Sequence, residues 1–181
     1  METLEAIKTR RSIRKYSDKP VDRDTIEKII AGAAYAPTWK NSQTARYKIV
    51  TNDAIKAQIA DNCVYGFAGN QNIIKGAPVL VVLTTVNSRS GYERDGSFST
   101  SKGTHWQSFD AGICAQTLCL TAHEYGLGTV IMGIFEEEKV IKALDIPEGE
   151  SVSALIALGY PAENPDAPKR KDTEQLVTYI E

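Results

Sequence analysis

Five cationic side chains gather near the start of the chain, and two hydroxyl side chains lie among them. The set comprises Lys8, Arg10, Arg11, Arg14 and Lys15 together with Ser12 and Ser17. Planar guanidinium groups and hydroxyl donors match the oxygens of a phosphate monoester. A charged run of this kind is also typical of a solvated surface, so charge alone leaves both interpretations open.

A second basic cluster, Lys169 to Lys171, lies near the opposite end of the sequence and includes Arg170. If the fold brings the two clusters together, their combined field forms an anion-binding site. The chain as a whole is slightly acidic, with 21 Lys and Arg against 23 Asp and Glu. The concentration of cations in two short segments is therefore a local feature.

Polar residues follow the expected end of a helix in the segment Pro37-Thr38-Trp39-Lys40-Asn41-Ser42-Gln43. The amides of Asn41 and Gln43 donate and accept hydrogen bonds at once, and Pro37 fixes the backbone beside them. This combination suits a heteroaromatic ring that carries a polyol chain. An ordinary polar loop, with Trp39 as a packing anchor, explains the same composition, and composition does not choose between the two.

Several common kinds of catalytic site are absent from the sequence. The two histidines, His105 and His123, do not occupy a metal-ligand pattern such as H-E-x-x-H, so we expect no metal site. Neither a G-x-S-x-G motif nor a phosphate-binding G-x-x-x-x-G-K-[ST] motif occurs. Cys119 and His123 are one helical turn apart and suit a nucleophile–base pair. A buried packing thiol is the simpler interpretation of Cys119, because small and apolar residues surround it.

The hydrophobic pattern predicts the elements that position these residues. Asp22 is expected to cap a helix that ends before Pro37 and buries Ile26, Ile29, Ile30, Ala33 and Ala34. The β-branched run from Pro78 to Val86 predicts a strand buried on both faces, at the centre of a sheet. Further helices are predicted over 4–11, 54–60 (capped by Asp53), 106–125 and 136–144, and further strands over 47–51, 129–132 and 152–158.

The order of these elements predicts one α+β domain over residues 1–181, built on a mixed central sheet flanked by helices. Residues 160–181 are expected to form an extended C-terminal tail. The polar stretch from Asn87 to Thr104 is longer than most loops of compact domains, so it is expected to be functional or disordered.

Composition limits the class of protein. The chain has 181 residues, of which 42% are hydrophobic and 24% charged, with a formal net charge of −2. These values exclude a globally basic nucleic-acid binder and a disordered chain. No apolar run approaches the ~18 residues that a membrane span needs, and no signal peptide is visible. Three cysteines, an odd number, favour a reducing, cytoplasmic setting.

Six motifs along the chain resemble, in order and spacing, those of the flavin-dependent nitroreductase family. They are R-R-S-I-R-K-Y (10–16), A-P-T-W-K-N-S-Q (36–43), N-Q-N-I-I-K-G-A-P (70–78), D-A-G-I-C-A-Q-T-L (110–118), G-L-G-T-V-I-M-G-I-F (126–135) and a final A-L-G-Y-P followed by P-K-R-K. Each motif alone is weak. Their common order over nearly the whole chain makes the resemblance specific.

The resemblance implies a nitroreductase-like fold and a homodimer that binds FMN noncovalently at its interface. Matched by motif, Arg10 and Ser12 would hold phosphate and ribityl oxygens, with help from the Arg11 backbone. Lys169 and Arg170 would complete the phosphate cage.

The resemblance also implies contacts to the flavin ring. Arg14 would face its pyrimidine edge, as would Asn70, or Gln71 after an offset of one residue. Gly133 and Ile134 would present backbone N–H groups to the ring. The partner subunit would contribute Pro37, Thr38, Trp39 and Asn41.

The implied activity is hydride transfer from NADH or NADPH, by way of the flavin, to an electron-poor acceptor such as a nitroarene or a quinone, with ping-pong kinetics. No side chain is expected to act as an obligate acid or base, because the cofactor carries the chemistry. The 87–104 loop is the best candidate to cover the site.

A module that stores or senses FMN without turnover is the alternative, because the bulky Trp39 stands where the family commonly has a small residue. A phosphate-ester hydrolase fits less well, since no nucleophile or metal site is visible.

Overall fold

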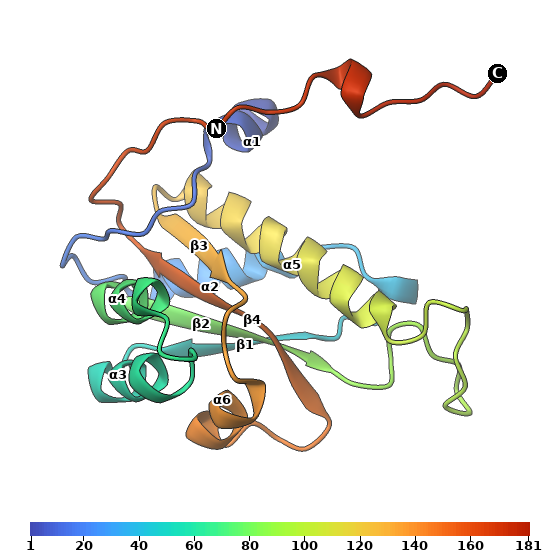
Figure 1. Cartoon of the computed structure of the whole chain (residues 1–181), viewed down its shortest axis with the longest axis horizontal. Coiled ribbons are helices and arrows are strands. Elements are labelled where there is room, and N and C mark those ends of the chain that lie inside the picture. Colours follow the sequence, from blue (N-terminus) through green and yellow to red (C-terminus); the bar gives the residue numbers. More distant parts are fainter.

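Four strands form one sheet in the computed structural model, which describes residues 1–181 (Figure 1). The sheet order is β1-β2-β4-β3, so β2 and β4 are central and β1 and β3 lie at opposite edges. The residues of β2 are buried except for the last, Val86, which confirms the prediction of a strand covered on both faces. The strands are β1 (Ala45–Val50), β2 (Val79–Val86), β3 (Gly128–Met132) and β4 (Glu150–Gly159).

All three strand pairs in the sheet are antiparallel, so the prediction of a mixed sheet is wrong. A helical crossover usually connects parallel strands, and a long helix does join β2 to β3. These two strands run in the same direction, since each is antiparallel to β4. However, β4 lies between them, and the one parallel pairing is an isolated bridge between Ser12 and Thr129.

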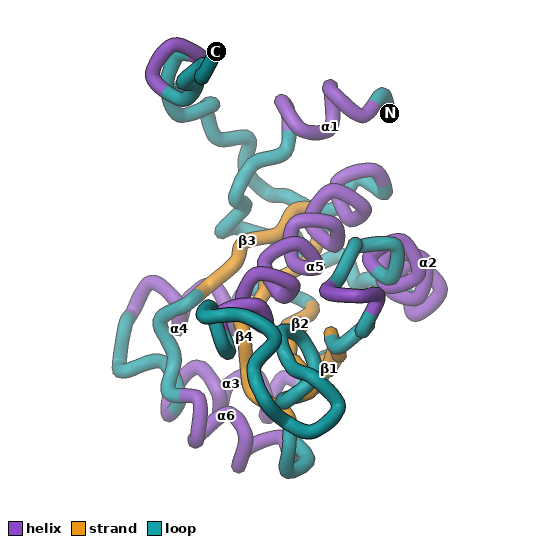
Figure 2. The backbone as a smooth tube through the Cα atoms, turned by 90° about the vertical axis from the view of Figure 1, so that its right-hand side faces the viewer, coloured by secondary structure: helices purple, strands orange, loops and turns teal.

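Helices cover both faces of the sheet (Figure 2). Alternate residues of β2 serve the two faces: Leu80 and Val82 join one core cluster, whereas Val81 and Leu83 join the other. This alternation is the two-residue period of a strand. No helix has the length and apolar character that a membrane span requires. One layer consists of α2 (Arg23–Ala33) and α5 (His105–Glu124), and the other of α3 (Asp53–Asn62), α4 (Ala68–Gly76) and α6 (Glu137–Leu144).

The helix caps agree with the sequence prediction in one case and differ in another. Asp22 caps α2 as predicted, and its carboxylate accepts a hydrogen bond from the Thr25 N–H (2.8 Å). The cap predicted for α3 is wrong by one residue, because Asn52 and not Asp53 accepts hydrogen bonds from the first N–H groups. Asn and Asp are equally good N-caps, so sequence does not separate neighbouring candidates.

Helix α4 was not predicted from the sequence. Its residues, A-G-N-Q-N-I-I-K-G, include two glycines and two asparagines, which are poor helix formers. Tertiary packing compensates, because Ile73 and Ile74 are buried in the core cluster of this layer. The helix matters for the site because it carries Asn70, a predicted site residue that is only 6% exposed.

Both ends of the chain extend beyond this layered body. Helix α1 (Thr3–Thr9) lies near the end of α5, and the C-terminal tail runs past it before projecting outward (Figure 1). The 3₁₀ turn η2 (Thr173–Gln175) is the one regular element of the tail. Leu176, Tyr179 and Ile180 are 67%, 83% and 95% exposed, so these apolar side chains find little cover within the chain.

Candidate functional site

The N-terminal segment lies along the free edge of β3. Ser12 forms the parallel bridge with Thr129, and the Ile13 N–H donates to the Thr129 carbonyl (2.9 Å). The two backbones come this close because Gly128 has no side chain: a Cβ there would lie 2.5 Å from Cγ1 of Ile13. The predicted site residues of this segment are thereby fixed at the start of β3; they are Arg10, Arg11, Ser12 and Arg14.

Arg10 is half-buried, and its Nε atom is buried with no hydrogen-bond partner. A cavity of about 330 Å³ opens beside it and is also lined by Arg11, His123 and Glu163. Leaving a buried charged donor without an acceptor is costly, so the arrangement favours an anionic ligand at Arg10. The exposed Arg14 differs, because its guanidinium donates to the carbonyl of Ser12.

The first residues of the C-terminal tail lie against the same segment. The Glu163 carboxylate accepts hydrogen bonds from the N–H groups of Arg14 (2.6 Å) and Lys15 (3.2 Å). Lys169 and Arg170 are exposed farther along the tail, where Arg170 donates only to a tail carbonyl two residues before it. No hydrogen bond or ion pair joins either residue to the N-terminal arginines. Within one chain, therefore, no contact of these kinds links the two basic clusters.

Asn70, Gly133 and Ile134 meet at the other end of β3. The Asn70 side-chain amide donates to the Ile134 carbonyl (3.0 Å), which holds the turn after the strand. The N–H groups of Gly133 and Ile134 donate to no group of the chain. A Cβ at Gly133 would meet nothing within 4 Å, and Ile134 is 48% exposed. The turn therefore offers two free donors on an open surface.

The two groups of residues lie at opposite ends of one strand edge. Ile134 follows Thr129 by five positions in the sequence, and an extended chain spans roughly 16 Å over five positions. A ligand along this edge must be elongated, with an anionic end for Arg10 and an end with acceptors for the free N–H groups. FMN has this arrangement, because a ribityl chain joins its phosphate to a ring that carries carbonyl oxygens and basic nitrogens. The residues present fit FMN.

Pro37, Thr38, Trp39 and Asn41 lie at the opposite edge of the sheet, before β1. The Trp39 N–H donates to Oδ2 of Asp110 (2.9 Å) near the start of α5. The N-terminal segment instead meets the end of α5, where Thr9 Oγ1 and His123 Nε2 are hydrogen-bonded (2.8 Å). Asp110 and His123 are 13 residues apart, so a helix separates them by roughly 20 Å. One chain does not bring both sets of residues to one ring.

Asp110 is a structural residue of this region that sequence reasoning did not single out. Its side chain accepts hydrogen bonds from Trp39 and from the buried Ser90 hydroxyl (2.7 Å), and the residue is 2% exposed. The ring of Trp39 also packs on that of Trp106, with centroids 4.6 Å apart. The sequence does hold a signal, because Asp110 is the one acidic residue inside a long apolar helix.

The structure favours the packing interpretation of Cys119. The residue is 2% exposed, and burial raises the pKa of its thiol. His123 points its Nε2 to Thr9. A neutral, enclosed thiol whose neighbouring imidazole is engaged elsewhere is a poor nucleophile.

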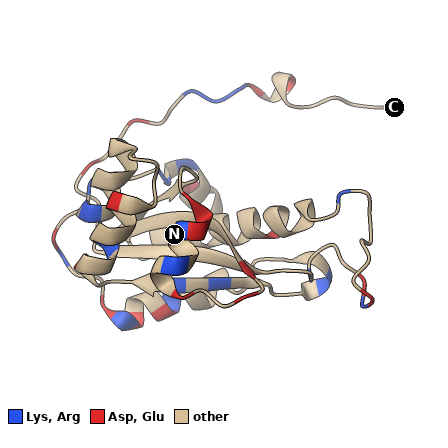
Figure 3. Cartoon of the chain, turned by 60° about the horizontal axis from the view of Figure 1, so that its bottom comes forward, with Lys and Arg blue, Asp and Glu red and all other residues tan.

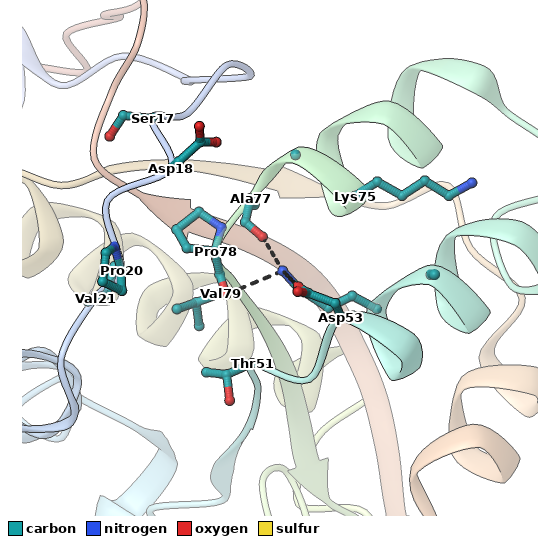
Figure 4. Close-up of a pocket in the computed structure, with 13 residues that line it drawn as sticks. Ser17, Asp18, Pro20, Val21, Thr51, Asp53, Lys75, Ala77, Pro78 and Val79 are labelled. Carbon is teal, nitrogen blue, oxygen red and sulfur yellow. Dashed lines mark hydrogen bonds and ion pairs between the residues drawn. The ribbon is translucent and has the colours of Figure 1, made fainter.

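A larger cavity of about 620 Å³ lies on another part of the molecule (Figure 4). Of the candidate binding residues that the sequence singles out, only Ser17 lines it. Lys56, whose side chain is 4% exposed, donates at this cavity to the carbonyls of Ala77 and Pro78 and pairs with Asp53 (2.9 Å). All three protons of the ammonium therefore have acceptors. This lysine joins α3 to the junction of α4 and β2 and leaves no donor for a ligand.

Replacing Lys56 with Met is expected to lower the free energy of unfolding by about 2 kcal/mol, because a buried charged donor is lost and the Ala77 carbonyl stays buried without it. Urea denaturation measures the change. The matched control is Lys75→Met: this side chain is 45% exposed and pairs with Asp61 at the surface, so about 0–1 kcal/mol is expected. Equal losses in the two variants would contradict the structural role of Lys56.

Comparison with known proteins adds to this geometry. A family model described as "Nitroreductase family" matches residues 7–69 and 65–160. A protein of Methanothermobacter thermautotrophicus, provisionally named an NADH dehydrogenase/NAD(P)H nitroreductase, is 33% identical over 180 residues, which is 97% of this chain and 86% of the relative.

Two solved structures extend the similarity to the fold. A nitroreductase family protein of Clostridium novyi NT is 32% identical, with a TM-score of 0.78 over 92% of this chain and 89% of that chain. The NADPH:FMN oxidoreductase of Vibrio harveyi, complexed with NAD+, is 26% identical, with a TM-score of 0.81 over 99% of this chain and 77% of that chain. Together with the family model, which matches most of the sequence, these similarities show that the chain belongs to the nitroreductase family.

Proposed function

We propose that the chain is an FMN-dependent NAD(P)H oxidoreductase that reduces electron-poor acceptors such as nitroaromatic compounds or quinones. Family membership supports the class of reaction. The observation that carries the proposal is that both ends of the β3 edge offer hydrogen-bond donors without partners. At the start of the strand the donor is Nε of Arg10, and after its end the donors are the N–H groups of Gly133 and Ile134.

The chain's own residues bind and orient the cofactor. Arg10 and Ser12 hold the phosphate and ribityl oxygens, and the amide of Asn70 keeps the 133–134 turn in place through its bond to Ile134. Bound FMN supplies a ring that accepts hydride and passes electrons on. Arg14 would place a positive charge near the pyrimidine edge of a bound flavin and would stabilise negative charge there.

A second copy of the chain completes the site in this proposal. Between His105 and Glu124 the one formally charged residue of α5 is the buried Asp110, so the exposed face of this long helix carries no charge before its last residue, Glu124 (Figure 3). A long exposed helix face without charge is typical of a homodimer interface. If two α5 helices pair about a twofold axis, the end that carries Trp39 in one copy comes to the β3 edge of the other.

The dimer also accounts for the predicted site residues that one chain does not bring together. We assign Pro37, Thr38, Trp39 and Asn41 of one copy to the ring bound by the other. The C-terminal tail projects from the body of its own chain (Figure 1), and Lys169 and Arg170 are exposed on it, so we assign them to a phosphate cage completed in the dimer. We infer that residues 1–181 form one domain. We also propose a cytoplasmic location, because all three cysteine thiols are free.

The visible spectrum of the purified protein, before and after addition of NADH or NADPH without oxygen, tests the proposed function. We expect a yellow protein that bleaches rapidly with at least one nucleotide. With an acceptor present, double-reciprocal plots are expected to be parallel, because donor and acceptor use the same open face in turn. A yellow protein that neither nucleotide bleaches would favour the storage or sensing module, and a protein that never binds FMN would overturn both.

A further inference from the structure

A cavity of about 500 Å³ lies between the turn that contains Trp39 and the loop from residue 87 to residue 104. Three cations line it, namely Lys40, Arg89 and Arg94, together with one acid, Glu93. We call it the loop cavity. Its lining therefore carries a formal charge of +2 in a chain whose own net charge is −2.

The acid of the loop cavity is already engaged. Glu93 forms an ion pair with Lys40 (3.2 Å) and accepts a hydrogen bond from the Ser99 hydroxyl. The Ser99 bond, followed by the contact with Lys40, holds the pKa of Glu93 below its usual value, so this carboxylate stays ionised and offsets Lys40. Arg89 and Arg94 form no ion pair and donate no side-chain hydrogen bond within the chain. Two guanidinium groups thus remain free in one cavity.

Two further donors of the same lining lack partners. The Nε1 atom of Trp39 and the Oγ atom of Ser42 are buried and form no hydrogen bond. Buried donors of this kind are uncommon in folded proteins, and each one calls for an explanation. Free guanidinium groups beside polar groups without partners fit an anionic ligand that carries several acceptor oxygens.

The place of the loop cavity relative to the proposed flavin site limits what this ligand is. Trp39 belongs both to the cavity and to the set that approaches the ring from the partner copy. A nicotinamide nucleotide that lays its nicotinamide on the ring must extend the rest of its length away from it. NADPH differs from NADH only in the 2′-phosphate of its adenosine, and arginine side chains commonly accommodate that phosphate.

We propose that the loop cavity binds the phosphorylated adenosine end of NADPH, with Arg89 and Arg94 holding the 2′-phosphate, and that the protein therefore prefers NADPH to NADH. This inference rests on the proposed function, because it takes the nucleotide to be the electron donor. Lys40 and Glu93 form a neutral pair beside the phosphate, and the hydroxyl of Ser42 offers a further donor.

Steady-state kinetics of the flavin-loaded protein provide the first test. In an Arg89→Met/Arg94→Met variant, kcat/KM for NADPH is expected to fall about thirtyfold, because charge-assisted hydrogen bonds to the phosphate are lost. The value for NADH is expected to change by less than about threefold. The matched control is Lys102→Met, which removes a cation of the same loop that does not line the cavity. An equal fall for both nucleotides would overturn the assignment of the 2′-phosphate.

Binding of nucleotide fragments provides a test that does not depend on turnover. Calorimetry is expected to show that the unaltered protein binds 2′,5′-ADP at least about tenfold more tightly than 5′-AMP, and that the double variant does not distinguish them. Equal affinities in the unaltered protein would overturn the inference even if NADH bleaches the flavin. Failure of both nucleotides to bleach the flavin would instead refute the proposed function. Circular dichroism of the double variant verifies that it is folded.

Discussion

An Arg10→Met variant is expected to bind FMN about a hundredfold more weakly than the unaltered chain and to be colourless when purified. The reason is that the guanidinium of Arg10 has a buried Nε without a partner, whereas the phosphate of FMN is a strong acceptor for it. A charge-assisted hydrogen bond contributes about 1.5–3 kcal/mol, and the upper part of this range corresponds to a hundredfold change. Methionine keeps a flexible apolar stem of similar length, so packing beside His123 is largely preserved.

Titration of the flavin-free proteins with FMN, followed by quenching of flavin fluorescence, measures the affinities. The matched control is Lys15→Met, because Lys15 is an exposed cation of the same segment and its side chain makes no hydrogen bond. Its affinity is expected to change by less than about threefold, as for other solvated charges. Equal losses in the two variants would mean that general charge, and not the buried donor of Arg10, attracts the phosphate. Equal melting temperatures of the flavin-free forms would exclude a folding defect.

The hydrophobic pattern within a single segment is sufficient to predict the helices and strands whose buried residues all lie in that segment. The run from Val79 to Leu83 is apolar at every position and therefore on both faces, and it forms most of the central strand β2. Asp22 precedes a stripe of helical period and caps α2. In both cases one segment carries the whole signal, so no distant partner is needed to interpret it.

The direction and order of strands are not local properties, and here the sequence prediction failed. The sheet is antiparallel throughout because β4, the last strand of the chain, inserts between β2 and β3. No residue pattern within β2 or β3 records that insertion. Helix α4 escaped prediction for a related reason, since the burial of Ile73 and Ile74 outweighs the poor helix propensity of their neighbours.

In the candidate site, too, residue type predicts some features, whereas others depend on contacts between distant segments. Arg10 and Ser12 were singled out by residue type, but the unpartnered Nε of Arg10 and the close approach at Gly128 depend on how the N-terminal segment lies against β3. Glu163, which fixes the tail to this segment, was not predicted because its partners are backbone N–H groups almost 150 residues away. Pairing with backbone groups leaves no trace in side-chain composition.

A Gly112→Glu variant is expected to raise the dissociation constant of the proposed dimer by at least about a hundredfold and to release FMN with it. Gly112 lies on the exposed face of α5, and a Cβ built there meets nothing within 4 Å of the same chain. The monomer therefore accommodates the new side chain, and replacing glycine within a helix favours the helix. In a twofold dimer the substitution enters the interface from both sides, and each buried unpaired charge costs about 3–5 kcal/mol.

Sedimentation velocity across a range of concentrations, with absorbance read at the flavin band, measures both effects together. Gly76→Glu is the matched control: it adds the same charge at an exposed glycine of α4 whose Cβ position is equally open, on the other face of the sheet from α5. This control is expected to remain a yellow dimer. Because Trp39 and Arg10 lie at opposite ends of α5, a monomer would present to the ring only the residues at the β3 edge. A flavin-loaded monomer would therefore contradict the shared site, and an unchanged Gly112→Glu dimer would move the interface away from α5.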